Sequence, residues 1–253
     1  MGLRDNKTAV ITGANSGIGL ATAGRFIAEG VDRVFITGRR QPELDTAAAQ
    51  LGTCATAVRG DVGTPEDLDR LYAEVAAGGN GIDIVMANAG STRVGRLGEI
   101  SDDDLDALLT TNVKGVVYTV QKALPLLNDS ASIIVTGSTT ADRGRAGLSI
   151  YAATKAAVRS LARTWANELA GRNIRVNVIV AGSTATPGSD TLAAQTDPNA
   201  SIDDFRAARV ATIPLGRFAD PVEIANAAVF LASNLSSFTT GSTISADGGF
   251  NQV

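Results

Sequence analysis

The sequence contains no histidine among its 253 residues. This absence excludes Ser-His-Asp and Cys-His hydrolases, and it excludes the common zinc sites in which histidine is a ligand. Any proton transfer must therefore use tyrosine, lysine, a carboxylate, a hydroxyl group or water. The single cysteine, Cys54, cannot form an internal disulfide. We therefore expect a reducing, cytoplasmic environment, and we expect no metal site.

The sequence also has fewer basic than acidic residues, with 22 Lys and Arg against 26 Asp and Glu, for a formal net charge of −4. No basic stripe is present, so we expect no nucleic-acid partner. No apolar run approaches the length of a membrane span, and residues 1–7 lack the apolar core of a signal peptide. We therefore expect no membrane partner. An α/β chain of this length is routinely one domain, and we predict a single domain over residues 1–253.

Short apolar runs alternate with helical patterns along the whole chain. The apolar runs lie near residues 7–12, 33–37, 55–60, 82–87, 131–136, 174–180 and 242–246. The helical patterns lie near residues 17–29, 42–51, 65–77, 102–127, 150–171 and 220–233. This alternation predicts right-handed crossovers and a doubly wound, seven-stranded parallel sheet of the α/β class, with helices on both faces.

One segment breaks this rhythm, at residues 183–212, which are rich in Ser, Thr, Asp and Pro. A segment of that length inside a compact domain is usually functional or mobile. We interpret it as a substrate lid over the ligand site, and a plain surface excursion is the alternative.

A glycine-rich loop directly follows the first apolar run and reads Thr12-Gly13-Ala14-Asn15-Ser16-Gly17-Ile18-Gly19. Gly13 allows a tight turn, Gly17 lets the backbone approach a pyrophosphate, and Gly19 permits close packing of the helix. The free N–H groups and the positive dipole end of the following helix attract phosphate. The position between a first strand and a first helix is the context in which such a loop binds a dinucleotide in a Rossmann fold.

Tyr151 and Lys155 lie four residues apart in a helical pattern, so their side chains share one face of the helix. A phenol is a poor proton donor at neutral pH. A fixed cation beside the phenol stabilises the phenolate and lowers its pKa, and we expect Lys155 to act on Tyr151 in this way.

Together these features resemble the classical short-chain dehydrogenase/reductase family over essentially the whole chain. The spacing of Gly13, Gly17 and Gly19 matches its TGxxxGxG loop, rather than the TGxxGxxG loop of the extended, epimerase-like members. The run Asn88-Ala89-Gly90 after the fourth strand resembles the family's NAG element, which steadies the sheet and borders the cofactor. The positions of the family's catalytic tetrad fall on Asn112, Ser138, Tyr151 and Lys155.

The resemblance implies a role for each member of this tetrad. Tyr151 would donate a proton in reduction and accept one in oxidation, and Ser138 would hold the carbonyl oxygen. Lys155 would hydrogen-bond the nicotinamide ribose, while Asn112 would kink its helix and hold a water molecule that relays protons. Taken singly, Ser138 could instead be a turn hydroxyl and Asn112 a helix-surface amide.

The end of the second strand bears on which nucleotide binds. Similar NAD-preferring enzymes carry Asp where this chain has Gly38, and two arginines follow, Arg39 and Arg40. The planar guanidinium suits a 2′-phosphate, so we expect NADP(H), with Arg39 on the phosphate and Arg40 assisting. A pair of solvated arginines is the alternative. Asp61 and Val62, after the third strand, resemble the pair that borders the adenine.

The loop after the sixth strand departs from the family, because Ala181 replaces the usual proline before Gly182. Thr184 and Thr186 remain candidates for contacts with the carboxamide or a phosphate. The layout of the family also implies that the outer, substrate-binding part of the site includes Thr140, Arg145, Val94 and the segment 183–212. Arg145 would recognise an anionic or polar substituent, and a surface salt bridge is the alternative.

The sequence therefore predicts an NADPH-dependent carbonyl reductase, reversible as an alcohol dehydrogenase, similar to bacterial enzymes that act on ketones and secondary alcohols. Three alternatives stay open: a dinucleotide-binding regulator or scaffold without turnover, a pathway-specific ketoreductase for 3-oxoacyl, sugar or polyketide-like substrates, and a non-redox lyase or isomerase. The helical patterns at 102–127 and 150–171 carry apolar residues on more than one face. We therefore expect the chain to associate with copies of itself, and the family resemblance implies a homotetramer or homodimer.

Overall fold

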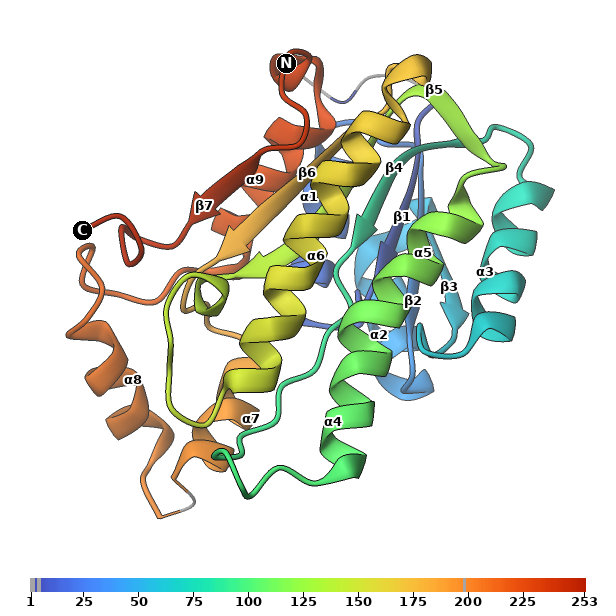
Figure 1. The fold of residues 1–253 in the computed structure, drawn as a ribbon. Coiled ribbons are helices and arrows are strands. Elements are labelled where there is room, and N and C mark those ends of the chain that lie inside the picture. Colours follow the sequence, from blue (N-terminus) through green and yellow to red (C-terminus); the bar gives the residue numbers. More distant parts are fainter. Residues whose placement is uncertain (1–2, 4–5, 198) are drawn as a thin grey trace.

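The structure is a computed structural model, and it describes residue 3, residues 6–197 and residues 199–253. The described strands form one parallel sheet in the order β3-β2-β1-β4-β5-β6-β7 (Figure 1). They are β1 (Thr8–Thr12), β2 (Arg33–Gly38), β3 (Ala55–Arg59), β4 (Ile82–Ala87), β5 (Leu127–Ser138), β6 (Arg175–Ala181) and β7 (Thr243–Ala246). This order confirms the predicted doubly wound Rossmann fold.

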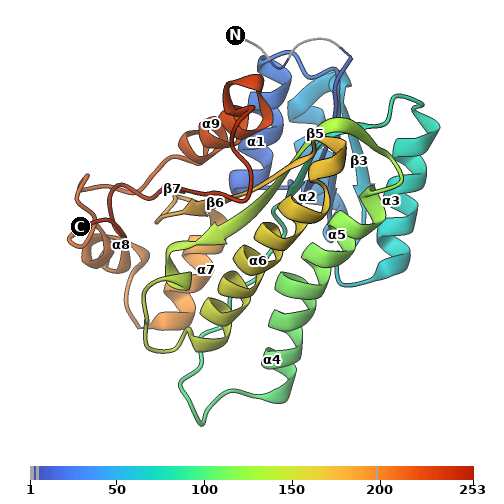
Figure 2. The same ribbon diagram turned by 45° about the horizontal axis from the view of Figure 1, so that its top comes forward.

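Helices cover both faces of the sheet (Figure 2). One face packs against α1 (Gly17–Ala28), α2 (Gln41–Leu51) and α9 (Pro221–Ala232). The other face packs against α3 (Pro65–Ala77), α5 (Gly115–Ala123) and α6 (Ser149–Glu168). Among the described residues, no helix is both long and apolar enough to cross a membrane.

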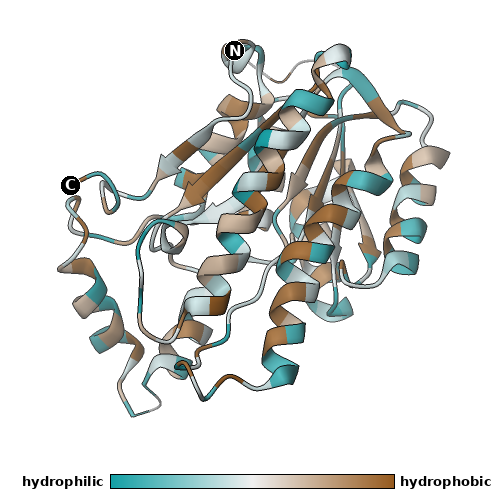
Figure 3. Cartoon of the chain, viewed as in Figure 1, coloured by the Kyte–Doolittle hydropathy of each residue, from teal (hydrophilic) through white to brown (hydrophobic). Residues whose placement is uncertain are grey.

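The strands are buried on both sides because apolar side chains alternate between the two faces. Val10 packs into the core beneath α3, α5 and α6, whereas its neighbour Ile11 packs into the core beneath α1 and α9. Val85 and Ile84 divide in the same way. Each such side chain stabilises the fold by about 1.5–3 kcal/mol when fully buried. Figure 3 shows the resulting apolar strands between helices that turn polar residues outward.

The helical pattern predicted over 102–127 is interrupted in the structure. It consists of α4 (Asp102–Leu109), a π-helical turn (Thr110–Lys114) and α5, which ends at Ala123, and β5 already begins at Leu127. The π-turn contains Asn112, whose buried side chain bonds to the backbone of a neighbouring loop. The wider turn sets that side chain toward the loop, which a regular helical period does not reveal.

The segment 183–212 is more regular than the sequence interpretation assumed, because it contains α7 (Pro187–Thr196) and α8 (Ile202–Val210). The Thr186 hydroxyl accepts from Ser189 N at 3.2 Å and begins α7, and the Ser201 hydroxyl accepts from Asp204 N at 3.0 Å and begins α8. Both helices lie beyond the carboxyl ends of β5 and β6 (Figure 1).

Candidate active site

A cavity of about 640 Å³ opens at the carboxyl ends of the parallel strands. Its walls come from the residues that follow β1, β2, β3, β4, β5 and β6, together with parts of α6, α7 and α8. From β1 the chain adds β2 and β3 on one side of the sheet, and from β4 it adds β5, β6 and β7 on the other side. The boundary between β1 and β4 is therefore the switch point of strand order, where α/β folds bind ligands.

Most of the residues that the sequence singled out line this cavity. They are Gly13, Asn15, Ser16, Gly17, Ile18, Arg39, Arg40, Asp61, Val62, Asn88, Ala89, Gly90, Ser138, Thr140, Arg145, Tyr151, Lys155, Gly182, Thr184 and Thr186. Three others lie outside its wall. Gly19 packs inside the glycine loop, Asn112 is fully buried, and Val94 packs against Gly147. No cluster of three potential metal ligands occurs in the described part of the chain.

The glycine loop packs closely against the neighbouring backbone and leaves hydrogen-bond donors for an anion. Gly13 has a φ of +65°, and a side chain there would come within 2.8 Å of the backbone of Ala89. At Gly19 a side chain would come within 2.5 Å of the Gly13 carbonyl oxygen. Ser16 begins α1 without a side-chain cap, and the first turn of α1 contains no acidic residue. The N-terminal N–H groups and dipole of α1 are therefore available to a phosphate, so this loop fits a dinucleotide.

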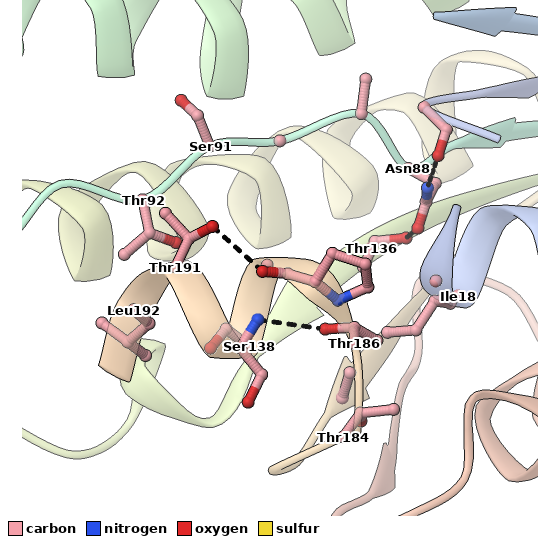
Figure 4. A pocket seen from close by; sticks show the side chains of 18 of the residues that line it. Ile18, Asn88, Ser91, Thr92, Thr136, Ser138, Thr184, Thr186, Thr191 and Leu192 are labelled. Carbon is pink, nitrogen blue, oxygen red and sulfur yellow. Dashed lines mark hydrogen bonds between the residues drawn. The ribbon is translucent and has the colours of Figure 1, made fainter. Parts of the chain in front are cut away.

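Asn88 ties three strands together at the floor of the cavity. Its amide nitrogen donates to the carbonyl oxygens of Thr12 at 3.0 Å and Gly13 at 3.2 Å. Its Oδ1 accepts from Thr136 Oγ1 at 3.2 Å (Figure 4). The Thr12 hydroxyl accepts in turn from the backbone N–H groups of Asn88 and Ala89, both at 3.1 Å. The carboxyl ends of β1, β4 and β5 are thereby fixed relative to one another.

Lys155 is a buried amine held by the end of β5. Its Nζ donates to the Thr136 carbonyl oxygen at 2.8 Å and lies 5.8 Å from the centroid of the Tyr151 ring. Burial lowers the pKa of Lys155 to about 8. Thr136 was not identified from the sequence. The period of two in β5 places the Thr136 side chain on the same face as that of Ser138, but the bond to Lys155 uses the backbone carbonyl oxygen, which no side-chain pattern marks.

The pKa of Tyr151 differs from the sequence-based expectation. Burial by the surrounding protein raises it, while the nearby Ser138 and Thr92 hydroxyls lower it to a smaller extent. Lys155 is not among the groups that shift the pKa of Tyr151, and its Nζ donates to the Thr136 carbonyl oxygen instead. In this structure Tyr151 is therefore a neutral phenol whose hydroxyl proton is retained at neutral pH.

The Ser138 hydroxyl is oriented by its own loop. Its oxygen accepts from Thr140 N at 3.3 Å and from Thr140 Oγ1 at 2.9 Å. A hydroxyl oxygen has two acceptor positions, so both are used, and its own O–H remains to donate into the cavity. Thr140, which the sequence analysis treated as a substrate contact, therefore also holds Ser138 in place.

At the far end of the cavity, Arg39 follows β2 and faces Asp61, with 3.7 Å between Nη1 and Oδ2. Asp61 Oδ1 accepts from Gly63 N at 2.9 Å. Arg40 forms the closer ion pair, because its Nε lies 2.6 Å from Glu43 Oε1. Of the two guanidinium groups, that of Arg39 is therefore the more available to bind a ligand.

The loop after β6 closes the cavity on its other side. Ala181 pairs with Ser138 of β5 and Ala246 of β7, so strand pairing sets the start of this loop in the absence of the family's proline. A side chain at Gly182 would come within 2.5 Å of Asp247 Cα. Thr184 donates to the Gly182 carbonyl oxygen at 3.0 Å. The loop is thus held by packing and hydrogen bonds on both sides.

The outer wall includes residues that the sequence analysis did not name singly. Thr92 follows β4, while Phe205 and Arg209 lie on α8, where they meet Arg145. Phe205 and Arg209 belong to the segment 183–212 expected over the ligand site, but α8 itself was not predicted and no local motif marks them.

Comparisons with known proteins agree with this geometry. A family model described as enoyl-(acyl carrier protein) reductase matches residues 13–251. The oxidoreductase asL5 of Sarocladium schorii is 46% identical over 249 residues, which cover 98% of this chain and 96% of that protein.

Solved structures match over nearly the full length. A short-chain dehydrogenase/reductase from Brucella melitensis, described as a glucose/ribitol dehydrogenase, has a TM-score of 0.92 at 33% identity, with both chains covered completely. A 3-ketoacyl-(acyl-carrier-protein) reductase from Brucella melitensis with NADH has a TM-score of 0.87 at 30% identity, covering 98% of this chain and 99% of the other. The actinorhodin polyketide ketoreductase with NADPH has a TM-score of 0.93 at 27% identity, with both chains covered completely.

The glycine loop, the seven-stranded order and these full-length matches lead to one assignment. The chain belongs to the classical short-chain dehydrogenase/reductase family of oxidoreductases that bind nicotinamide dinucleotides.

Proposed function

We propose that this protein is an NADPH-dependent reductase that converts a ketone to a secondary alcohol, and that oxidises the alcohol in the reverse direction. The observation that carries the proposal is the convergence of Ser138, Tyr151 and Lys155 on one cavity, whose opposite wall is the glycine loop. A donor hydroxyl, a neutral phenol and a buried amine beside a dinucleotide cradle form a set suited to carbonyl reduction.

When held at the glycine loop, a nicotinamide dinucleotide would supply the hydride for the carbonyl carbon. As the C=O π electrons move onto the oxygen, the Ser138 O–H donates a hydrogen bond to the developing negative charge. Tyr151 gives its phenolic proton to that oxygen, which completes the alcohol. The high pKa of Tyr151 keeps this proton in place until the more basic alkoxide forms. In oxidation the same groups act in reverse.

Lys155 restores the proton of Tyr151 in this scheme. A phenolate next to the amine favours the ammonium form of Lys155, whose pKa of about 8 allows it to gain and lose a proton near neutral pH. We assign Lys155 a second role as the hydrogen-bond donor to the nicotinamide ribose. Asn112 is assigned to the path along which water returns protons to Lys155.

NADPH is favoured over NADH by the residues after β2. Because residue 38 is glycine, no carboxylate is present there to accept hydrogen bonds from the ribose hydroxyls. A side chain at this position would come within 2.8 Å of Asn15 Oδ1. Arg39 follows with an exposed guanidinium that no close ion pair occupies. A guanidinium held, among the described residues, only by this 3.7 Å contact with Asp61 suits a 2′-phosphate.

Residues 183–212 are assigned as a lid of two helices. The lid is tied together by Arg206 Nη2 and Asp190 Oδ1 at 2.8 Å, and it begins against the glycine loop, where Thr186 packs beside Gly17. Closure of such an element excludes water from the reacting atoms.

We also infer that the protein acts as a homotetramer or homodimer in the cytoplasm, where Cys54 stays reduced. Exposed apolar side chains such as Leu215 and Val253 border β7, an edge strand that can be covered by a second copy. Light scattering of the eluting protein gives the assembly mass, and a monomer at micromolar concentration would contradict this assignment.

The function is tested by offering aryl, cyclic and 3-oxoacyl ketones with NADPH and with NADH in parallel, while the absorbance of the reduced nucleotide is followed. We expect ketone-dependent oxidation of NADPH. In Tyr151→Phe we expect the turnover number to fall by about 10²-fold or more while the nucleotide still binds. Tight nucleotide binding without turnover across the panel would instead indicate a regulator or scaffold.

A further inference from the structure

Two cavity arginines lack the carboxylate partner that the other cavity arginines have. Arg145 lies between β5 and α6, and Arg209 lies on α8. Neither forms a salt bridge with any residue that the structure describes. The other arginines in the wall each face a carboxylate, in the pairs Arg39–Asp61, Arg40–Glu43 and Arg93–Asp104. The alternative of a surface salt bridge at Arg145 therefore does not hold for the described residues.

Aromatic rings and one hydroxyl hold these two side chains at the cavity. The Cζ of Arg145 lies 5.6 Å from the centroid of the Phe205 ring, and the Cζ of Arg209 lies 4.9 Å from that of Phe250. Arg209 Nη2 also donates to Ser183 Oγ at 3.3 Å. A guanidinium has five N–H donors, so most of the donors of this pair remain available to a ligand.

The two cations are costly to hold together without an anion. Both are half-buried, and burial lowers the pKa of each, while the charge of Arg145 further lowers the pKa of Arg209. Guanidinium groups nevertheless remain charged in proteins. An oxyanion between them would offset the repulsion and accept hydrogen bonds from planar forks that suit carboxylate and phosphate.

The position of the pair separates it from the nucleotide. Arg39 and Arg40 follow β2, on one side of the central strands β1 and β4, whereas Arg145 follows β5 and Arg209 follows β6 on the other side. The pair therefore lies on the same side as Ser138, which ends β5, and borders the space left for the substrate.

We propose that Arg145 and Arg209 bind an oxyanion of the substrate, so that the ketone reduced by this protein carries a carboxylate or a phosphate ester. The inference rests on the proposed reductase function. It names the class of substrate that the outer part of the same cavity selects.

The test compares ketones with one carbon skeleton: a keto acid, its methyl ester and the corresponding keto phosphate. We expect the charged compounds to have the higher kcat/KM. Arg145→Gln and Arg209→Gln should each lower the ratio of kcat/KM for acid over ester by about ten- to hundredfold, the loss typical of one charge-assisted hydrogen bond. Arg143→Gln is the matched control, because Arg143 contacts Phe250 at 4.7 Å but does not line the cavity. Its ratio should stay within about twofold of the wild type.

A second measurement does not depend on turnover. The saturated carboxylate of the same skeleton, which has no ketone, should raise the midpoint of thermal unfolding of the wild type and of Arg143→Gln, but not of Arg209→Gln. An ester that is reduced as well as the acid, or a ratio that neither arginine variant changes, overturns this inference and leaves the reductase function intact. Absence of turnover with every ketone overturns the reductase function, and the unfolding shift then decides for or against the oxyanion site. A higher kcat/KM for the phosphate than for the acid identifies phosphate as the oxyanion.

Discussion

The side-chain amide of Asn112 pairs with both backbone polar groups of Ser91. Asn112 Oδ1 accepts from Ser91 N at 2.8 Å, and Asn112 Nδ2 donates to the Ser91 carbonyl oxygen at 2.9 Å. The same nitrogen donates to Thr154 Oγ1 at 3.2 Å, and Thr154 donates to the Tyr151 carbonyl oxygen at 2.7 Å. The loop after β4 is thereby joined to the helix that carries the phenol.

Asn112→Ala should therefore affect both stability and catalysis. The change leaves the N–H and C=O of Ser91 without their partners in a partly buried setting, so we expect the free energy of unfolding to fall by about 1–3 kcal/mol. The kcat should fall as well, because Tyr151 loses its link to the cavity wall. Urea denaturation and steady-state kinetics measure the two effects. The exposed Asn234→Ala should change the free energy of unfolding by less than about 0.5 kcal/mol. Equal stability of the two variants would refute the role of the pair.

Removing the hydroxyl of Thr140 should release the Ser138 side chain. Thr140→Val keeps the shape and the backbone N–H but loses the 2.9 Å bond from Thr140 Oγ1 to Ser138 Oγ. We expect the kcat to fall about tenfold, the cost of one hydrogen bond in the transition state, with the KM for the nucleotide within about twofold of the wild type.

The conservative variant separates the hydroxyl from the methyl group. Thr140→Ser retains the donor, so it should restore most of the kcat lost in Thr140→Val. If Thr140→Ser is as slow as Thr140→Val, then packing rather than the hydrogen bond to Ser138 explains the loss.

The buried amine of Lys155 gives stability a definite dependence on pH. Its pKa is lowered from 10.5 to about 8 in the folded protein. Below about pH 8 the Lys155 amine is protonated in both the folded and the unfolded state, and burial of its charge lowers the free energy of unfolding by its full amount. As the pH rises from about 8 toward 10.5, the folded state loses this proton before the unfolded state does. The unfolded state then binds more protons, so this cost is relieved, by up to about 3 kcal/mol.

Lys155→Met removes this titration. We expect the free energy of unfolding of the wild type, measured relative to Lys155→Met, to increase between about pH 7.5 and 9.5. Urea denaturation at several pH values in this range gives the difference directly, and groups that titrate alike in both proteins cancel. A difference that stays flat or decreases with pH would show that the amine is not held in a charge-disfavouring environment.

The sequence was sufficient for the sheet and for most of the cavity wall, for physical reasons. Alternation of apolar side chains marks buried strands, and the carboxyl ends of parallel strands lie together. Residues that follow separate strands, such as Gly13, Arg39, Asn88 and Ser138, are therefore close in space although far apart in sequence.

The rest depended on contacts that no local pattern encodes. The family resemblance implied a kink at Asn112, and the helical pattern alone did not show it. The π-turn there is set by hydrogen bonds to a loop about twenty residues away. The caps at Thr186 and Ser201 were readable as helix starts, but the polar composition of the segment concealed α7 and α8. The pKa of Tyr151 depends on the balance between burial and nearby charge, which requires coordinates.

The choice of nucleotide gives the last prediction. Arg39 is 3.7 Å from Asp61, too far for a close ion pair, whereas Arg40 is held at 2.6 Å by Glu43. Arg39→Ala should therefore raise the KM for NADPH by about 10- to 100-fold, while the KM for NADH changes by less than about threefold. Arg40→Ala should have a smaller effect on NADPH.

The exposed Arg70→Ala serves as the control for lost surface charge, because Arg70 lies outside the cavity wall and pairs with Asp67 at 2.7 Å. It should leave the KM values for both nucleotides within about twofold of the wild type. If Arg39→Ala weakens NADPH and NADH equally, the guanidinium does not contact a 2′-phosphate. In that case the Gly38 backbone and Asn15, rather than Arg39, would contact the ribose. The expected preference of this chain for NADPH would then have no physical basis.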